Sequence, residues 1–167
     1  MAYDPLRALR VLQEHDVGFL VIGGVAGRLW GSPSLTNDTD ICCAHDTCNL
    51  ERLAAALRAL DARLRGVDGD VQFTLDARSL SSAQTLTFST NAGALDVLAT
   101  PAGTRGYDEL MANAERFDLG EALLVPVCSL DDLIRMKRAA GRPKDRIELE
   151  VLTAVRDERD THDAANR

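Results

Sequence analysis

The sequence predicts an α/β (or α+β) fold in which helices flank a mixed β-sheet. Short apolar runs of strand length alternate with longer segments in which apolar residues recur at helical spacing. The chain has 167 residues, of which 46% are hydrophobic and 27% charged, so it is long enough to bury a sizeable core. We therefore expect one domain over residues 1–157 and a polar tail over 158–167 that frays.

The first third of the chain predicts three helices and two strands. Three leucines, beginning at Leu6, recur every three residues and place an amphipathic helix near the N-terminus. Gly31 ends the second helix, while Thr47 or Asn49 can cap the third. The expected order is a helix over 4–15, a strand over 17–22, a helix over 24–30, a strand over 39–43 and a helix up to residue 60.

The rest of the chain predicts strands separated by turns, followed mainly by helices. Asp68-Gly69-Asp70 is typical of a turn between two strands. Ser129 can cap a helix that Gly141 and Pro143 end. The expected strands cover 62–65, 71–75, 85–89, 94–98 and 122–127, and the expected helices cover 107–114, 130–140 and 144–156.

Charge and cysteine content restrict the class of protein. The formal net charge of −7 argues against a broad basic surface that coats nucleic acid. No apolar run approaches the roughly 20 residues of a membrane span, and the N-terminus lacks the basic and hydrophobic regions of a signal peptide. The cysteines form no Cys-x-x-Cys pair, so neither a zinc site nor a disulfide framework is indicated. We expect a cytoplasmic protein without membrane partners.

The main chemical motif combines a glycine pair with two aspartates. The apolar run 19–22 leads into Gly23 and Gly24, and Asp38 and Asp40 follow at the next expected strand. Side chains two residues apart in a strand share a face, so both carboxylates point to one place. Mg²⁺ binds few protein carboxylates and completes its shell with phosphate oxygens and water, while glycine lets the backbone approach a phosphate closely. The pattern indicates a site for Mg²⁺ and nucleotide phosphates; a turn, which uses the same residue types, is the alternative.

Asp96 is the candidate for a third carboxylate. It lies in the middle of the apolar strand 94–98, where an unpaired charge is costly. A metal ion at this position would balance the charge. An arginine partner, or an edge position that faces water, would explain the residue equally well.

The order of these motifs resembles the nucleotidyltransferase superfamily built on the DNA polymerase beta fold, in which a Gly-Gly or Gly-Ser pair precedes Asp-x-Asp. The words Gly23-Gly24-Val25-Ala26 and Thr36-Asn37-Asp38-Thr39-Asp40-Ile41 resemble the minimal nucleotidyltransferases and the AbiEii/MenT-type toxins. Many such relatives carry an arginine where this chain has Ser34. The resemblance implies the nucleotidyltransferase fold, metal binding by the two aspartates of the second word, and a catalytic site completed by Asp96.

Both lysines of the chain, Lys137 and Lys144, flank the run Gly141-Arg142-Pro143. This segment resembles the C-terminal helical element of AbiEii-type nucleotidyltransferases. The resemblance implies that Lys137 contacts the triphosphate, that Arg142 or Lys144 adds positive charge, and that Asp145 orients one of them. A solvated basic helix face is the alternative explanation.

Together these residues lead us to expect a Mg²⁺-dependent nucleotidyltransferase that moves NMP from an NTP such as ATP to a hydroxyl group. Two metal ions are expected, with Mn²⁺ as an alternative to Mg²⁺. Gly23 and Gly24 would cradle the phosphates. The resemblance implies a tRNA, protein or small-molecule acceptor, and a cognate antitoxin or toxin as a further partner. The alternative is a catalytically silent, antitoxin-like protein of the same fold that acts by binding a partner.

Overall fold

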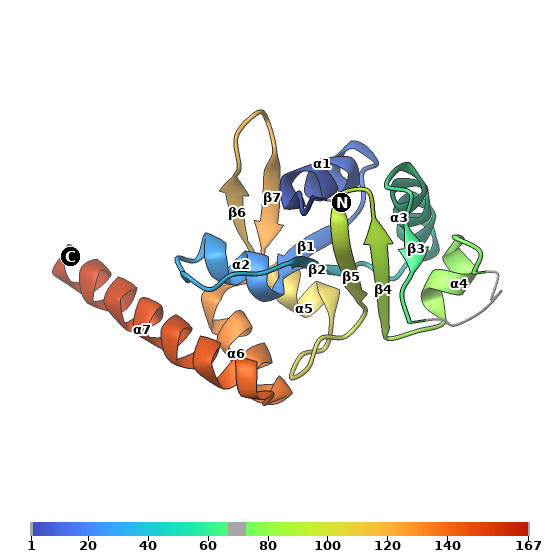
Figure 1. Cartoon of the computed structure of the whole chain (residues 1–167). Coiled ribbons are helices and arrows are strands. Elements are labelled where there is room, and N and C mark those ends of the chain that lie inside the picture. Colours follow the sequence, from blue (N-terminus) through green and yellow to red (C-terminus); the bar gives the residue numbers. More distant parts are fainter. Residues whose placement is uncertain (1, 67–72, 167) are drawn as a thin grey trace.

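Seven strands form one mixed sheet (Figure 1). The computed structural model describes residues 2–66 and 73–166. The strand order is β3-β4-β5-β2-β1-β7-β6; β2 runs parallel to β5 and β1 to β7, while the other neighbours are antiparallel. The predicted mixed α/β class is therefore confirmed. In chain order the elements are α1 (Pro5–Glu14), β1 (Phe19–Ile22), α2 (Gly23–Leu29), β2 (Asp38–Cys43), α3 (Thr47–Ala59), β3 (Arg63–Leu64), α4 (Ala77–Ser81), β4 (Thr85–Thr90), β5 (Gly93–Leu98), α5 (Tyr107–Ala112), β6 (Glu115–Asp118), β7 (Leu124–Val127), α6 (Leu130–Ala140) and α7 (Pro143–Ala165).

The centre of the sheet is the best-buried part of the molecule. All four residues of β1 are buried, as are the last three residues of β2. Successive strand residues point to opposite faces, so both faces of the sheet are covered here. The covering side chains include Leu12 of α1, Leu53 of α3, Leu110 of α5 and Leu133 of α6, which all belong to one core.

The first helix buries only two of its three regularly spaced leucines. Leu9 and Leu12 are fully buried, whereas Leu6 is 48% exposed. Three residues fall short of one 3.6-residue turn, so each step rotates the side chain by about 60° in the same direction. The leucines therefore drift around the helix, and Leu6 leaves the core face.

The N-cap of α3 differs from the prediction. Asp46, and neither Thr47 nor Asn49, caps the helix, because the Asp46 carboxylate accepts a hydrogen bond from the Asn49 backbone N–H at 2.9 Å. The Asn49 side chain is buried instead and accepts a hydrogen bond from the Gly18 backbone N–H at 2.6 Å. It therefore ties α3 to the start of β1.

Three predicted or missed segments need correction. The expected turn at 68–70 and the first two residues of the expected strand 71–75 lie outside the described residues, and residues 73–75 are not in a strand. Two elements were not predicted: α4, which Asp76 caps through the Ser79 backbone N–H, and β6, which pairs with β7 at the edge of the sheet.

The C-terminal helix α7 leads away from the sheet (Figure 1) and continues to Ala165, past the expected end at Arg156. No glycine or proline interrupts it after Pro143. The Arg159 guanidinium lies 4.7 Å from the ring centre of Trp30, which itself donates from Nε1 to the Cys128 carbonyl oxygen at 2.9 Å. The division into a domain over 1–157 and a tail stays a prediction. In the part of the chain that the structure describes, no helix has the length and apolar character needed to cross a bilayer.

Candidate active site

Two parallel strands bring three carboxylates together. Asp38 and Asp40 lie on β2, and Asp96 lies directly opposite Asp40 on β5. Paired positions of neighbouring strands project to the same face, as do positions two apart in one strand. One carboxylate oxygen from each of the three residues lies within 4.8 Å of the other two. The sheet register thus assembles the three aspartates that the sequence singles out.

The loop before β2 and the N-terminal segment fix the position of Asp38. The Thr36 hydroxyl donates to Oδ1 of Asp38 at 2.9 Å and to its carbonyl oxygen at 3.1 Å. The Tyr3 hydroxyl donates to the same carbonyl oxygen at 2.8 Å. These contacts hold both the backbone and the carboxylate where the strand begins.

The glycine pair at the start of α2 packs directly against this site. Gly23 has a φ of +64°, and a Cβ on it would lie 2.1 Å from Oδ2 of Asp40. A Cβ on Gly24 would lie 2.6 Å from the Thr36 hydroxyl oxygen. Only residues without a side chain fit at either position. The glycines are therefore required for the close approach of α2 to the carboxylates.

Two of the three carboxylates, those of Asp40 and Asp96, have a raised pKa. Burial is the main cause that raises the pKa of Asp40 to about 6, and the charges of Asp38 and Asp96 add to it. Burial also raises the pKa of Asp96, although Arg65 opposes the rise. Clustered negative charge of this kind is stabilised by a cation, and a set of carboxylate oxygens suits a hard divalent ion such as Mg²⁺ or Mn²⁺. The donor set therefore fits the divalent metal that the sequence resemblance implies.

A second cluster of charges lies beside the first, at the junction of α6 and α7. Asp145 is fully buried and accepts from Nε of Arg142 at 2.6 Å, while Nζ of Lys137 lies 3.4 Å from its Oδ1. Burial alone would raise the pKa of Asp145, but Arg142 and Lys137 outweigh it and hold the pKa below the ordinary value. Asp145 thus fixes both basic side chains.

The basic side chains are close enough to act on the carboxylates. Lys137 lowers the pKa of Asp40, and Lys144 lowers that of Asp96, though in each case burial is the larger effect. Three residues predicted to bind the nucleotide, Lys137, Arg142 and Lys144, therefore lie near the aspartates.

Sequence reasoning missed Tyr3, Thr36 and Arg65. The Arg65 guanidinium donates to Oδ1 of Asp96. Arg65 follows β3 and its partner lies on β5, and the Tyr3–Asp38 contact likewise joins segments far apart in the chain. A local sequence pattern cannot predict such a contact. Thr36, however, lies in the segment 36–41 that also contains Asp38 and Asp40.

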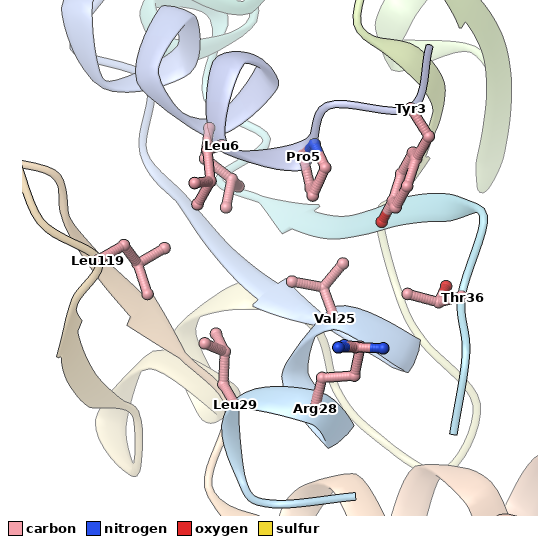
Figure 2. A pocket seen from close by; sticks show the side chains of 9 residues that line it. Tyr3, Pro5, Leu6, Val25, Arg28, Leu29, Thr36 and Leu119 are labelled. Carbon is pink, nitrogen blue, oxygen red and sulfur yellow. The ribbon is translucent and has the colours of Figure 1, made fainter. Parts of the chain in front are cut away.

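An apolar cavity of about 370 Å³ lies between α1 and α2 (Figure 2). Tyr3 and Thr36, which both hydrogen-bond to Asp38, form part of its wall, and Arg28 lies beside Val25 on the α2 side. The volume falls in the range of small-molecule pockets, about 300–1,000 Å³. The remaining lining residues are apolar: Pro5, Leu6, Leu9, Leu29 and Leu119.

Comparison with solved structures identifies the fold. No protein-family model matches the sequence, and no curated protein is similar to it. The lincosamide antibiotic adenylyltransferase LnuA, solved with lincomycin bound, is 13% identical, with a TM-score of 0.60 over 88% of this chain and 92% of LnuA. The solution structure of the antibiotic-resistance factor ANT(2'')-Ia is 15% identical, with a TM-score of 0.53 over 96% of this chain and 92% of the other. The crystal structure of ANT(2'')-Ia in complex with adenylyl-2''-tobramycin is also 15% identical, with a TM-score of 0.51 over 96% and 95%. The chain therefore has the nucleotidyltransferase fold.

Proposed function

We propose that the protein is a Mg²⁺-dependent nucleotidyltransferase that moves NMP from an NTP to a hydroxyl group. The observation that carries the proposal is the convergence of Asp38, Asp40 and Asp96 within 4.8 Å. Arg65 compensates the charge of Asp96, but Asp38 and Asp40 make no ion pair with the described residues, so bringing the three carboxylates together is costly without a further cation. A structural role for them would be better served by uncharged side chains.

The three aspartates would have different roles in the transfer. The acceptor oxygen would attack the α-phosphorus, the bond from that phosphorus to the bridging oxygen would break, and pyrophosphate would leave. Asp38, Asp40 and Asp96 would hold the metal, and the Asp96 carboxylate would also accept the hydroxyl proton. A divalent ion bound there would neutralise phosphate charge.

The basic residues and glycines would position the triphosphate. Lys137 and Lys144 act on the charge of Asp40 and Asp96, so phosphates that lie against the carboxylates would also feel them. Gly23 and Gly24 leave no side chain between the α2 backbone and the phosphates. Asp145 would keep Lys137 in place. Positioning and charge neutralisation of this kind supply most of the catalysis in phosphoryl transfer.

A small molecule with a hydroxyl group is the acceptor class that the structure supports best. The cavity lined by Tyr3 and Thr36, which both hydrogen-bond to Asp38, has the size and apolar lining of a small-molecule pocket. The net charge of −7 disfavours a long polyanion such as tRNA. LnuA and ANT(2'')-Ia, which share the fold, are an antibiotic adenylyltransferase and an antibiotic-resistance factor.

A toxin that acts with a cognate antitoxin is the second candidate function, and its support is the resemblance of residues 23–26, 36–41 and 137–145 to AbiEii/MenT-type proteins. Such a protein would modify tRNA or a partner protein in place of a small molecule. The acidity of the chain places this candidate second.

The test is transfer of label from each α-labelled NTP, with Mg²⁺, to a lincosamide, an aminoglycoside, tRNA or the proteins of a lysate. We expect wild-type protein to label at least one acceptor, a small molecule first, and Asp38→Asn to label none. Label on tRNA or protein alone would favour the toxin. No label on any acceptor, with no pyrophosphate release, would favour a catalytically silent binding protein.

A further inference from the structure

A row of paired residues crosses the sheet at the acidic cluster. Asp40 of β2 lies opposite Asp96 of β5, which lies opposite Thr87 of β4. The backbone N–H of Arg65 donates to the Thr87 carbonyl oxygen at 2.8 Å and continues the register of β3 with β4. Paired positions project to one face of a sheet. The Arg65 side chain therefore reaches over Thr87 to Asp96.

Arg65 occupies one of the two carboxylate oxygens of Asp96. Its Nη2 donates to Oδ1, and across residues 2–66 and 73–166 this is the one ion pair made by any of the three clustered aspartates. The Arg65 side chain is 39% exposed and that of Asp96 is 18% exposed, so the guanidinium lies at the rim of the site. Among the described residues, no hydrogen bond is made to the other oxygen, Oδ2.

We propose that Arg65 is a positioning residue, which holds Asp96 in the orientation that completes the metal site with Asp38 and Asp40. The inference rests on the proposed function, because it requires metal binding at this cluster. Without the contact, the Asp96 side chain can adopt other staggered rotamers, and repulsion from the two neighbouring carboxylates favours those that turn away. Carboxylates that bind metal are themselves held by hydrogen bonds, and loss of such a partner typically weakens metal binding 10–100-fold.

The positive charge of Arg65 acts in the opposite direction. A cation beside the site repels a divalent ion, so if charge dominated, removal of Arg65 would tighten metal binding. Arg65→Lys separates the two effects, since lysine keeps the charge but lacks the planar fork that grips a carboxylate. The sign of the change in affinity therefore decides between orientation and repulsion.

The experiment titrates Mn²⁺ into the full chain and measures free Mn²⁺ by electron paramagnetic resonance. Arg65→Ala is expected to weaken Mn²⁺ binding about tenfold or more, and Arg65→Lys to restore part of the loss. Arg63→Ala is the matched control: Arg63 lies two residues earlier on β3 and shares its face, yet it makes no ion pair with the described residues. This control is expected to bind Mn²⁺ like the wild type.

Unchanged or tighter binding by Arg65→Ala would overturn the inference, and so would an equal loss in Arg63→Ala. The melting temperature without metal, measured for each variant, shows whether the fold is intact. If Arg65→Ala fails to fold, Arg65→Lys decides: weaker binding supports the inference and unchanged binding overturns it. A wild-type protein that binds no Mn²⁺ at millimolar concentration would overturn the proposed function and the inference together, whereas wild-type binding with an unaffected Arg65→Ala would overturn the inference alone.

Discussion

At the scale of single residues, Asp40 shows most directly what the convergence of three carboxylates costs. Burial, Asp38 and Asp96 raise its pKa to about 6 in the folded protein. The folded chain then keeps a proton that the unfolded chain has lost above about pH 4, so metal-free stability falls as pH rises from about 4 to about 6. The fall is about 3 kcal/mol at most for a shift of about two pKa units.

Asp40→Asn is expected to remove this fall, because asparagine does not titrate. Urea unfolding of both proteins without metal, at a series of pH values from about 4 to about 7, measures the free energy of unfolding. Parallel pH profiles in the two proteins would show that Asp40 titrates like an ordinary exposed carboxyl.

Gly23 and Gly31 separate the effect of backbone strain from that of a blocked site. Both have positive φ, +64° and +107°, but a Cβ would strike Asp40 only at Gly23 and meets nothing within 4 Å at Gly31. Each alanine variant is expected to lose about 1–2 kcal/mol from the left-handed backbone. Only Gly23→Ala should also lose Mn²⁺ binding. Wild-type Mn²⁺ affinity in Gly23→Ala would mean that the close approach of α2 plays no part in the site.

Lys137 and Arg156 lie on α6 and α7 and differ in their distance from the proposed nucleotide. Lys137 contacts the buried Asp145. Burial raises the pKa of Asp40, and the charge of Lys137 opposes part of that rise. Arg156, in contrast, pairs with the exposed Asp131 at 3.7 Å. Lys137→Ala should weaken NTP binding about tenfold or more, while Arg156→Ala should change it little, because salt screens exposed charges beyond about 8–10 Å. The NTP dissociation constant at two salt concentrations measures this. Equal, small effects would mean that Lys137 belongs to a solvated helix face.

The residues of the site differ in how far the sequence could predict them. Asp38 and Asp40 stand two apart after a glycine pair, and this local spacing is visible in one sequence. Asp96 stands out because its apolar neighbours make a charge unexpected there. Arg65 has no such signal, since only the β3–β4–β5 register brings it to Asp96.

At the scale of elements, apolar strands were predictable and polar edge elements were not. The strand 19–22 is wholly buried and apolar, so its pattern is unambiguous. β6 carries Glu, Arg, Phe and Asp with three exposed positions, and it is a strand because β7 pairs with it. The leucine spacing in α1 wrongly placed Leu6 on the buried face, because a strict three-residue repeat drifts around a helix. The backbone partner, and not the sequence of the segment, decides structure in such places.

The end of α7 makes a testable claim at this scale. Beyond residue 157, the side chain of Arg159 contacts the rest of the described chain by stacking over the ring of Trp30. Truncation after Asp157 should therefore give a folded protein that is about 0.5–1 kcal/mol less stable, and Arg159→Ala should lose the same amount. Chemical denaturation of the three proteins measures it. A truncated chain that fails to fold would show that the domain extends beyond residue 157.

At the scale of the whole molecule, both lysines of this acidic chain lie near the three clustered aspartates. The net charge is −7, yet Lys137 and Lys144 both act on the clustered aspartates. A local basic patch in an acidic protein suits a compact anion such as a triphosphate better than a long nucleic acid. The fold separates the two sets of charges: β2 and β5 carry the carboxylates, while α6 and α7, which lie outside the sheet, carry the lysines (Figure 1).

The most direct measurement of the central claim is anomalous diffraction from crystals grown with Mn²⁺ and a non-hydrolysable NTP analogue. The account predicts an anomalous peak coordinated by carboxylate oxygens of Asp38, Asp40 and Asp96, with the triphosphate between Gly23–Gly24 and Lys137. Crystals of Asp40→Asn grown under the same conditions should lack the peak. Nucleotide bound elsewhere on the molecule would contradict the account. So would the absence of an Mn²⁺ peak at the three carboxylates when Mn²⁺ is at saturating concentration.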